Sequence, residues 1–311
     1  MTTTITSTSF DDLPLLNRGK VRDLYAVPGA DDQLLMVATD RISAFDVVLP
    51  AGIPGKGQLL TSLSLEWFRL IEPIIPNHLI TADVDAMPPA IKKHADVLRG
   101  RTMLVKKAHV VPIEAIVRSY LSGSAWKEYK VKGSIHGIEL PKGLVESDKL
   151  SNVMFTPSTK AEAGEKDMNL HPDEAAKLIG VELCALIAEK AIEIFNFASK
   201  HAAERGLILA DTKFEFGLLP ATHEGQSLKE RLILVDEVLT PDSSRFWEAK
   251  LYKPGQAQTS FDKQYLRDFL LKREKEGIPY NSAIPDDIIE GIRTKYAEAL
   301  QRLTGPPTEA V

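Results

Sequence analysis

The sequence predicts a mixed α+β fold, and three observations lead to this class. Near the start of the chain, the apolar runs VRDLYAV and QLLMVATD flank the turn-rich PGADD, which is typical of a β-hairpin. From about Pro172 to Arg205, apolar residues recur at helical spacing over a long stretch. Two more strand-like segments, GLILADTKFEFGLL and RLILVDEVL, follow that stretch. Strands and helices thus fall into groups, without the regular alternation of a doubly wound sheet.

Composition and charge narrow the classes of partner. The 311 residues are 44% hydrophobic and 26% charged, as in ordinary globular proteins, and their net charge is -5. No overall basic field attracts nucleic acid or an anionic membrane, so an anionic ligand has to be held by local cations. Cys184 is the one cysteine, which excludes an intrachain disulfide and suits a reducing compartment. Because no apolar run is long enough to span a bilayer and the N-terminal residues lack a signal-peptide pattern, we expect a cytoplasmic protein.

The front of the chain divides into a tail and a β-rich lobe. Residues 1–14, which begin with a Thr/Ser-rich run, predict a flexible tail. Residues 15–110 predict mostly strands, including the hairpin above and a later strand in TMLVKKAHVV. Between these strands TSLSLEWFRLIEP predicts a helix, because Leu63, Trp67 and Leu70 recur at helical spacing.

Residues 111–245 mix helix and strand, and residues 246–311 are expected to be helical. The long helix begins at Pro172 with Asp173 next to it, and Gly206 suits the position just after its end. The two strands that follow are joined by the polar PATHEGQSLKE, which favours an antiparallel ribbon. Near the C-terminus PDDIIEGIRTKYAEALQRL predicts a helix, whereas the final TGPPTEAV predicts disorder.

The segment LADTKFEFG places ionisable side chains at alternate positions. In a strand, Asp211, Lys213 and Glu215 share one face. Phe214 and Phe216 lie on the other face, where they can pack into a core. The charged row then faces either solvent, as on an edge strand, or a functional cleft, and this segment alone leaves both interpretations open.

A second strand, LILVDE, also runs from apolar residues into acids, Asp236 and Glu237. Two strands that deliver carboxylates past an apolar core suggest that these side chains meet, and carboxylates that meet need a cation. Mg²⁺ binds through one or two carboxylates together with substrate phosphates. Glu215 and Asp236 are therefore candidate Mg²⁺ ligands, with Lys213 placed to meet an anion and Asp211 left to face a substrate.

Two further stretches have the residues to hold phosphate groups. NRGKVRDLYAV sets one glycine before Lys20 and Arg22, and such a turn can lie over nucleotide phosphates, although an ordinary hairpin turn has the same pattern. In VVPIEAIVRSYLSGSAWKEY a strand is expected to end at Pro112, before Glu114. Arg118, with the serines and backbone N–H groups of SGS, can bind a phosphate, and an ordinary surface arginine and loop are the alternative.

Several familiar motifs are absent from the sequence. GIPGKGQLLTS lacks the Walker A spacing, and no G-x-G-x-x-G, H-E-x-x-H, C-x-x-C or G-x-S-x-G occurs. The common dinucleotide, zinc-protease, redox and hydrolase functions therefore have no support. DRISAFD and LTPDSSRFW place Ser43, Asp46 and Arg245 near turns, for which local turn capping is the plain alternative.

Together these motifs resemble the SAICAR synthetase family of purine biosynthesis. The two signature segments are VVPIEAIVRSYLSGS and LADTKFEFG, and RGKVRDLY, DRISAFD, LVDEVLTPDSSRFW and SFDKQYLRDFL also fit, in order, over residues 18–270. FTPSTKAEAGEKD is similar to the long, monomeric type of fungi and some bacteria. The resemblance implies a SAICAR-synthetase fold. A kinase-like, ATP-grasp-like nucleotide lobe would span 15–110, an α+β lobe with substrate and metal sites 111–245, and a packed helical segment 246–311.

The resemblance also implies a reaction and the roles of individual residues. ATP and Mg²⁺ would serve the ligation of L-aspartate to CAIR, 5-amino-1-(5-phosphoribosyl)imidazole-4-carboxylate, giving SAICAR, ADP and phosphate through an acyl phosphate. The expected partners of this monomer are small-molecule substrates, not nucleic acid or a membrane. The implied roles are catalysis by Asp46, Asp211 and Lys213; nucleotide binding by Gly19, Lys20, Val21, Arg22, Lys107 and Glu114; substrate binding by Ser43, Arg118, Ser124, Arg245, Asp262 and Lys263; and Mg²⁺ binding by Glu215 and Asp236.

Two other functions fit part of the sequence. A kinase-like phosphotransferase needs only the front lobe and the Mg²⁺ pair, but the chain lacks the H-R-D and D-F-G signatures of protein kinases. A non-catalytic nucleotide-binding protein of the same fold is disfavoured by the presence of Lys20, Glu215 and Asp236.

Overall fold

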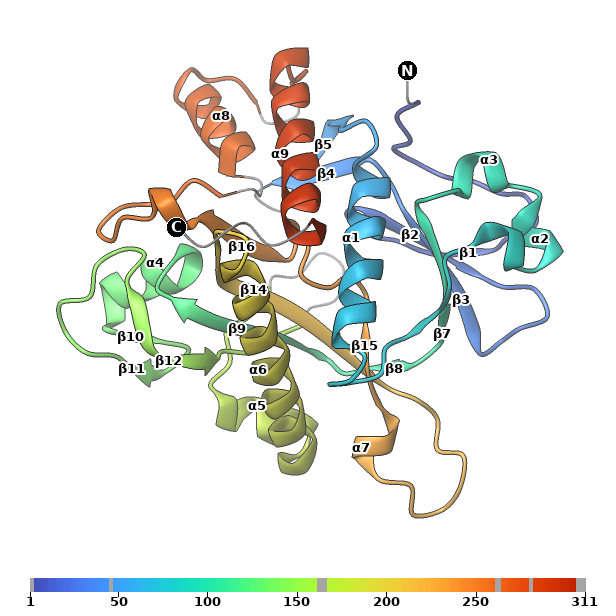
Figure 1. Ribbon diagram of the computed structural model, residues 1–311, viewed down its shortest axis with the longest axis horizontal. Helices are drawn as coiled ribbons and strands as arrows, with labels where there is room; N and C mark the ends of the chain where they lie inside the picture. The colour runs from blue at the N-terminus through green and yellow to red at the C-terminus, as the bar shows by residue number, and fades with distance from the viewer. Residues whose placement is uncertain (1–2, 45–46, 161–166, 261–263, 280–281, 306–311) are drawn as a thin grey trace.

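The computed structural model describes residues 3–44, 47–160, 167–260, 264–279 and 282–305. Its strands form two main sheets, and helices pack against them (Figure 1). The predicted α+β class is confirmed. Within these ranges, none of the helices combines the length and the apolar character needed to cross a membrane.

The first sheet is antiparallel, with the strand order β1-β2-β3-β7-β6. Its strands are β1 (Leu15–Arg18), β2 (Arg22–Ala26), β3 (Gln33–Ala38), β7 (Thr102–Lys106) and β6 (Leu79–Thr81). The predicted hairpin is β2 with β3, which pair from Arg22 opposite Ala38 to Ala26 opposite Leu34. Three short helices and a separate hairpin complete this region: η1 (Val84–Ala86), α2 (Pro89–Lys92) and α3 (Ala95–Leu98), then β4 (Arg41–Ala44) with β5 (Val47–Gly52).

The second sheet is organised around β14 (Leu207–Leu218), the strand that contains LADTKFEFG. On one side β14 pairs with β9 (Ile113–Tyr120) and β8 (His109–Val110). On the other side β16 (Ser244–Glu248) pairs with its first half and β15 (Leu232–Val235) with its second half. The predicted antiparallel ribbon is therefore confirmed as β14 and β15. The interpretation of β14 as a solvated edge strand is wrong, because it has neighbours on both sides.

Smaller elements extend this sheet and connect its strands. β12 (Lys149–Phe155) and β13 (Ser158–Thr159) pair with β9, and β10 (Ser134–Ile135) pairs with β11 (Ile138–Glu139). The remaining short or peripheral helices are α4 (Gly123–Lys132), α7 (Leu228–Arg231), η2 (Ala249–Leu251) and α8 (Gln264–Lys275). Residues 246–311 were expected to be helical, but they begin with the second half of strand β16, and the helices η2, α8 and α9 (Asp286–Thr304) follow it.

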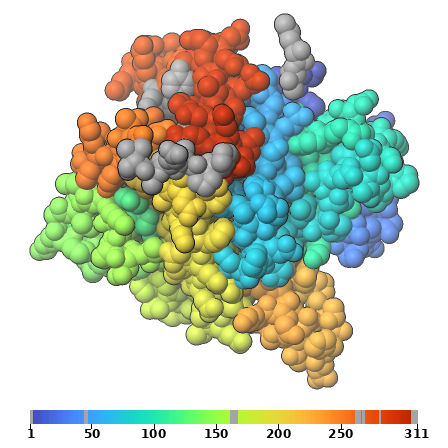
Figure 2. All heavy atoms as spheres, in the orientation of Figure 1, coloured from blue at the N-terminus to red at the C-terminus, as the bar shows by residue number. Residues whose placement is uncertain are grey.

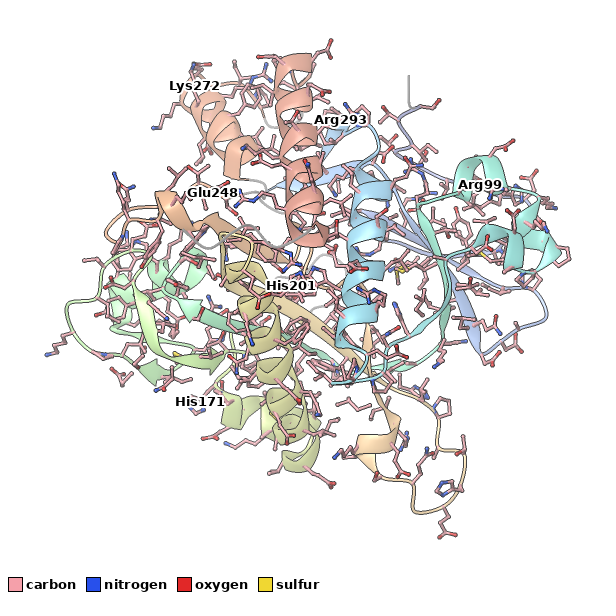
Figure 3. All side chains as sticks on the ribbon, in the orientation of Figure 1. Arg99, His171, His201, Glu248, Lys272 and Arg293 are labelled. Carbon is pink, nitrogen blue, oxygen red and sulfur yellow. The ribbon has the colours of Figure 1, made fainter. Side chains whose placement is uncertain are left out.

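Three helices contribute to the core that lies on one face of the second sheet. They are α1 (Lys56–Ile71), α6 (Val181–Ala203) and α9 (Asp286–Thr304), and they lie in contact across the centre of the face in Figure 2. α6 packs directly on β14 and β9 (Figure 1), and its buried Ile187 and Ile194 share one core with Phe214 and Phe216. Figure 3 labels His201 near the end of α6, where its Nε2 lies 2.8 Å from the carbonyl oxygen of Leu303 in α9.

The helix predicted from Pro172 to Arg205 is wrong in one respect: it is two helices. α5 (Pro172–Ile179) begins at Pro172 as predicted, but it ends before Gly180, and α6 starts at the next residue. Gly180 has a φ of 93°, which no helical residue adopts and which glycine reaches at little cost. α6 ends at Ala203, two residues before the predicted end at Arg205, and Gly206 in the turn that follows has the left-handed φ of 67° expected of a glycine after a helix.

Two more expectations are corrected by the structure. A strand, β8, does end just before Pro112, but a second strand, β9, begins directly after it, so Glu114 and Arg118 lie within a strand. The described part of the predicted flexible tail is packed, because Thr8 is buried and its Oγ1 donates a hydrogen bond of 2.7 Å to Asp23. Leu13 is also buried. The C-terminal helix is confirmed as α9, and most of TGPPTEAV lies outside the described residues.

Candidate active site

The face of the second sheet opposite α6 carries a row of charged side chains. Asp211 on β14 lies directly opposite Arg118 on β9 and Arg245 on β16. Lys213 lies opposite Ile116, so the alternation of the strands puts Glu114 and Glu215 next in the same row. The predicted charged face of β14 is therefore continued by two neighbouring strands. It has an arginine end, defined by Arg118, Asp211 and Arg245, and a carboxylate end around Glu215.

The arginine end holds two guanidinium groups around one buried carboxylate. Arg245 Nη1 donates hydrogen bonds of 2.7 and 2.8 Å to the two oxygens of Asp211, and Ser122 Oγ donates one of 3.0 Å to the same carboxylate. Arg118 Nη1 lies 4.0 Å from Asp211, and its Nε donates to Thr156 Oγ1 at 2.8 Å. Two positive charges against one negative charge leave a net positive site, which suits a phosphate.

The almost complete burial of Arg118 affects its pKa. It lowers the pKa of the guanidinium, an effect that the Asp211 carboxylate opposes. An arginine still remains charged under such conditions, because its ordinary pKa is so high. A charged and almost fully buried side chain favours an anionic partner, since few water molecules reach it.

Gly123 permits the close packing of this end. It begins α4 with a φ of 58°, and a Cβ atom built on it would lie 2.5 Å from Arg245 Nη2. Any other residue would meet both backbone strain and a clash with the guanidinium. The glycine of SGS therefore makes room for Arg245. The neighbouring Ser124 is exposed on the first turn of α4.

The carboxylate end gathers four acids and three cations. Lys213 Nζ donates a hydrogen bond to Glu114 Oε1 and lies 3.7 Å from Glu215 Oε1. Lys160 Nζ donates a hydrogen bond to Glu215 Oε2. The third cation is Arg22 at the start of β2, which contacts Asp236 at 2.6 Å and Glu237 at 3.2 Å just after β15.

The pKa values at this end follow from burial and mutual pairing. Burial would raise the pKa of Glu215, but Lys160 and Lys213 outweigh it and hold that pKa below its ordinary value. Burial would likewise lower the pKa of Lys213, and Glu114 and Glu215 reverse this and raise it. Both groups are therefore charged at neutral pH, and the site is an ionic cluster.

The predicted glycine turn delivers Arg22 to this cluster. Gly19 N–H donates a hydrogen bond of 2.8 Å to the carbonyl oxygen of Arg22, which closes the turn. Arg41 holds the turn in place, because its guanidinium donates hydrogen bonds to the carbonyl oxygens of Gly19 and Lys20 at 2.9 and 3.2 Å. Val21 is buried, and its carbonyl oxygen accepts a bond from Thr39. The turn and the strand ends thus meet at one edge.

Comparisons with known proteins show the family to which the chain belongs. Residues 15–281 match the sequence profile of the SAICAR synthetase family. The chain belongs to the SAICAR synthetase family. It is 49% identical over 305 residues to the phosphoribosylaminoimidazole-succinocarboxamide synthase of Desulfotalea psychrophila, with 98% of this chain and 100% of that protein covered.

Solved members of the SAICAR synthetase family also share the fold. The enzyme of Saccharomyces cerevisiae, solved as a complex with SAICAR, has a TM-score of 0.85 and 44% identity, covering 99% of this chain and 100% of that chain. A type-2 SAICAR synthetase solved in complex with ADP has a TM-score of 0.63 and 25% identity, covering 94% of this chain and 99% of that chain. The fold inferred from the motifs is therefore confirmed.

Some residues predicted for a SAICAR synthetase site are not brought to the two ends by any described contact. Lys107 is exposed between β7 and β8, and its backbone N–H donates to Asp32 at 2.8 Å. Ser43 is buried in β4, opposite Val48 of β5. Their roles stay predictions. Three further predicted site residues lie outside the described residues: Asp46, Asp262 and Lys263.

The structure also brings in residues that the sequence did not single out. Lys160 contacts Glu215, Thr156 holds Arg118, and Glu237 joins Asp236 on Arg22. The sequence could have indicated Glu237 as a site residue, because it directly follows Asp236 in LILVDE. Lys160 and Thr156 had no such signal, since FTPSTKAEAGEKD shows no periodic charge pattern, and residues 155–160 come to the site through the pairing of β12 and β13 with β9.

The donor atoms of the carboxylate end fit Mg²⁺. They are carboxylate oxygens, which this hard cation prefers, and one or two of them suffice when phosphates supply the rest. Within the described residues, no group of three or more His, Cys, Asp or Glu side chains is arranged to hold a metal ion by itself. The lysines and Arg22 instead neutralise the acids. A metal here would depend on substrate phosphates for part of its coordination.

Proposed function

We propose that this chain joins L-aspartate to the carboxylate of CAIR, with conversion of ATP to ADP and phosphate, through an acyl phosphate. The family assignment supports the ligation, because the curated relatives are phosphoribosylaminoimidazole-succinocarboxamide synthases. The products of that reaction are found in related structures: one contains SAICAR and another contains ADP.

The acyl phosphate is proposed on chemical grounds. A carboxylate is a poor electrophile, because its negative charge repels an amine and oxide is a poor leaving group. Transfer of the γ-phosphoryl group of ATP to a carboxylate oxygen of CAIR would release ADP and create a phosphate leaving group. The amine of aspartate would then attack the carbonyl carbon, lose a proton and expel phosphate as the amide bond forms.

The two-ended row on β14 is the observation that carries this proposal. Asp211 and Glu215 are four residues apart, which is about 13 Å along a strand. A ribonucleotide whose phosphate binds Arg118 and Arg245 would extend along the strand and present its carboxylate towards the carboxylate end. There the turn that contains Gly19 would cover the phosphates of ATP. One strand would thus align the acceptor with the phosphoryl donor.

The residues at the carboxylate end have separate proposed tasks. Glu215 and Asp236 would hold Mg²⁺, which supplies positive charge to the phosphates when it is bound. Lys213 would stabilise charge on the phosphoryl group in transfer, a role supported by its position between Glu114 and Glu215. Asp211 would orient Arg245 and face the substrate.

Further roles are proposed from the resemblance alone. They are nucleotide binding by Gly19, Lys20, Val21, Arg22, Lys107 and Glu114, substrate binding by Ser43, Ser124, Asp262 and Lys263, and a catalytic role for Asp46. We also propose a monomer in the cytoplasm, which is supported by the similarity of FTPSTKAEAGEKD to the long monomeric type and by the single Cys184.

The ligation is tested by measuring ADP release from ATP and Mg²⁺ with and without CAIR and aspartate. We expect sustained ADP formation only when both are present. ADP formation that ignores both compounds would favour the kinase-like alternative and contradict the ligase. ATP binding without turnover under any of these conditions would favour a non-catalytic nucleotide-binding protein.

The intermediate needs a separate experiment. CAIR labelled with a heavy oxygen isotope in its carboxylate would pass one labelled oxygen to phosphate if an acyl phosphate forms. We therefore expect mass spectrometry to detect label in the released phosphate. Unlabelled phosphate alongside normal SAICAR formation would exclude the acyl phosphate and leave the ligation intact.

A further inference from the structure

Lys160 is the cation of the carboxylate end that the sequence motifs did not predict, and it contacts a proposed metal ligand. Its Nζ donates a hydrogen bond to Glu215 Oε2, whereas Lys213 Nζ lies 3.7 Å from Glu215 Oε1. Each oxygen of the Glu215 carboxylate thus faces an ammonium group. A divalent cation that binds through this carboxylate competes with these ammonium groups for its charge.

A cation is needed beside Glu215 before any metal arrives. The side chains of Glu114 and Glu215 are only 12% and 11% exposed, and the two residues lie side by side on β9 and β14. Carboxylates buried together without compensating charge are costly. The contact between Lys160 and Glu215 supplies such a charge in the ligand-free enzyme.

Among the three cations of the cluster, Lys160 is the one best placed to move. Lys213 holds Glu114 as well as Glu215, and Arg22 bridges Asp236 and Glu237. Lys160 follows the short strand β13, and its side chain is 38% exposed. A lysine also carries its charge on a flexible stem of four carbons, so that the ammonium can turn without a movement of the strand.

We propose that Lys160 is a further catalytic residue, whose ammonium occupies the metal side of Glu215 until Mg²⁺ and nucleotide bind and then contacts the phosphoryl group in transfer. This inference rests on the proposed function, because it takes Glu215 as a metal ligand. Arrival of the divalent cation repels the ammonium, and the phosphates that arrive with it attract the ammonium. Lys160 thereby exchanges one anionic partner for another.

The first test measures metal binding without turnover. Mn²⁺, a probe for Mg²⁺ that can be followed by electron paramagnetic resonance, is titrated into the nucleotide-free enzyme. We expect Lys160→Met to bind Mn²⁺ about fivefold more tightly than the wild type, because the competing ammonium is gone. Lys160→Arg, which keeps the charge, should bind no more tightly than the wild type. Equal or weaker Mn²⁺ binding by Lys160→Met would contradict the proposal that the Lys160 ammonium occupies the metal side of Glu215.

A matched control separates this effect from a general change in charge. Lys190 on α6 contacts Glu193 at 2.6 Å, on the face of the sheet opposite the charged row. Lys190→Met removes the same charge and also breaks one lysine–glutamate pair. We expect its Mn²⁺ affinity and its turnover to match the wild type. An equal gain in Mn²⁺ affinity from Lys190→Met would show that net charge, and not the contact with Glu215, is responsible.

The second test measures catalysis by the complete enzyme with ATP, Mg²⁺, CAIR and aspartate. We expect Lys160→Met to lower kcat about 100-fold, which is typical when one charge-stabilising group is removed, and Lys160→Arg to recover part of it. A kcat near the wild-type value in a folded Lys160→Met variant would overturn the contact with phosphate. Failure of the wild type to form SAICAR would instead contradict the proposed function, whereas the Mn²⁺ titration needs no turnover and tests Lys160 by itself.

Discussion

Arg245 and Asp211 face each other across the pairing of β16 with β14, and one guanidinium nitrogen, Nη1, contacts both carboxylate oxygens at 2.7 and 2.8 Å. The Asp211 carboxylate also accepts a hydrogen bond from Ser122 Oγ and lies 4.0 Å from Arg118 Nη1. Asp211 therefore orients the cations of the arginine end. Asp211 on β14 lies between Arg118 on β9 and Arg245 on β16, which explains why LADTKFEFG has an acid before Lys213 and Glu215.

The contact of Gly123 with Arg245 leads to a prediction about substrate affinity. Gly123→Ala should displace the guanidinium, because the new Cβ would lie 2.5 Å from Nη2. We expect the KM for CAIR to rise on the order of tenfold, the effect of losing one charge-assisted hydrogen bond, with little change in the KM for ATP. Steady-state kinetics with each substrate varied in turn measures both values.

Gly133 offers a matched control for that substitution. It ends α4 with a φ of 72°, and a Cβ atom there would meet nothing within 4 Å. Gly133→Ala should therefore cause backbone strain alone, with an unchanged KM for CAIR. If both variants raise the KM for CAIR equally, strain in α4 and not the position of Arg245 is the cause.

Glu215 is predicted to be essential for turnover and dispensable for folding. Glu215→Gln keeps the shape of the side chain but removes its charge, which weakens a metal ligand. We expect kcat to fall about 100-fold or more, the usual cost of losing a group that stabilises the transition state. Activity is measured as SAICAR formation, and circular dichroism checks the fold. Near-normal activity would show that Glu215 does not hold the metal.

Lys56 and Asp242 form a buried ion pair that predicts a large effect on stability. Lys56 Nζ contacts Asp242 at 2.6 Å, with side chains 0% and 3% exposed, and Tyr296 of α9 donates a hydrogen bond to the same carboxylate. Lys56→Met should lower the free energy of unfolding by about 3–5 kcal/mol, because it removes a buried cation that contacts a buried carboxylate. Urea unfolding measures this change.

A partly exposed pair on α9 provides the comparison. Lys295 contacts Glu298 at 3.0 Å, with side chains 41% and 33% exposed. Lys295→Met should change the free energy of unfolding by no more than about 1 kcal/mol, since water screens this pair. Similar losses in the two variants would mean that the Lys56–Asp242 pair contributes no more than a surface contact.

His78 predicts a dependence of stability on pH. Burial lowers its pKa from 6.5 to about 4; Asp236 opposes this effect, and Arg22 adds to it. Because the folded state binds the proton less readily than the unfolded state, the contribution of His78 is fully present above pH 6.5. It is lost as the pH falls from 6.5 towards 4. The expected loss at pH 5 is about 2 kcal/mol in the free energy of unfolding.

Urea unfolding at pH 7.5 and pH 5 measures this loss, and His78→Gln isolates it from other groups. Burial also lowers the pKa of His136 and of His201, so these histidines add to the acid sensitivity of the wild type and of the variant alike. The wild type should therefore lose more stability than His78→Gln on going to pH 5. Equal losses in the two proteins would contradict the assignment to His78.

The alternation of side chains along β14 explains how much of the site was predictable. Asp211, Lys213 and Glu215 had to share a face once the segment was a strand, and the acids after β15 had to lie near it once the two strands paired. Glycine and proline were more ambiguous. Gly180 was hidden inside an otherwise helical pattern, and Pro112 follows the end of one strand but gave no sign that another begins at Ile113.

The sequence by itself determined the α+β class, the charged face of β14 and the family, because these depend on local periodicity and on long motifs read in order. Only the tertiary structure decided which charges meet. Lys160 lies 55 residues from Glu215, Arg22 lies 214 residues from Asp236, and Lys56 lies 186 residues from Asp242. Contacts at such separations are fixed by strand register and by the packing of α1 and α9, which no local pattern records.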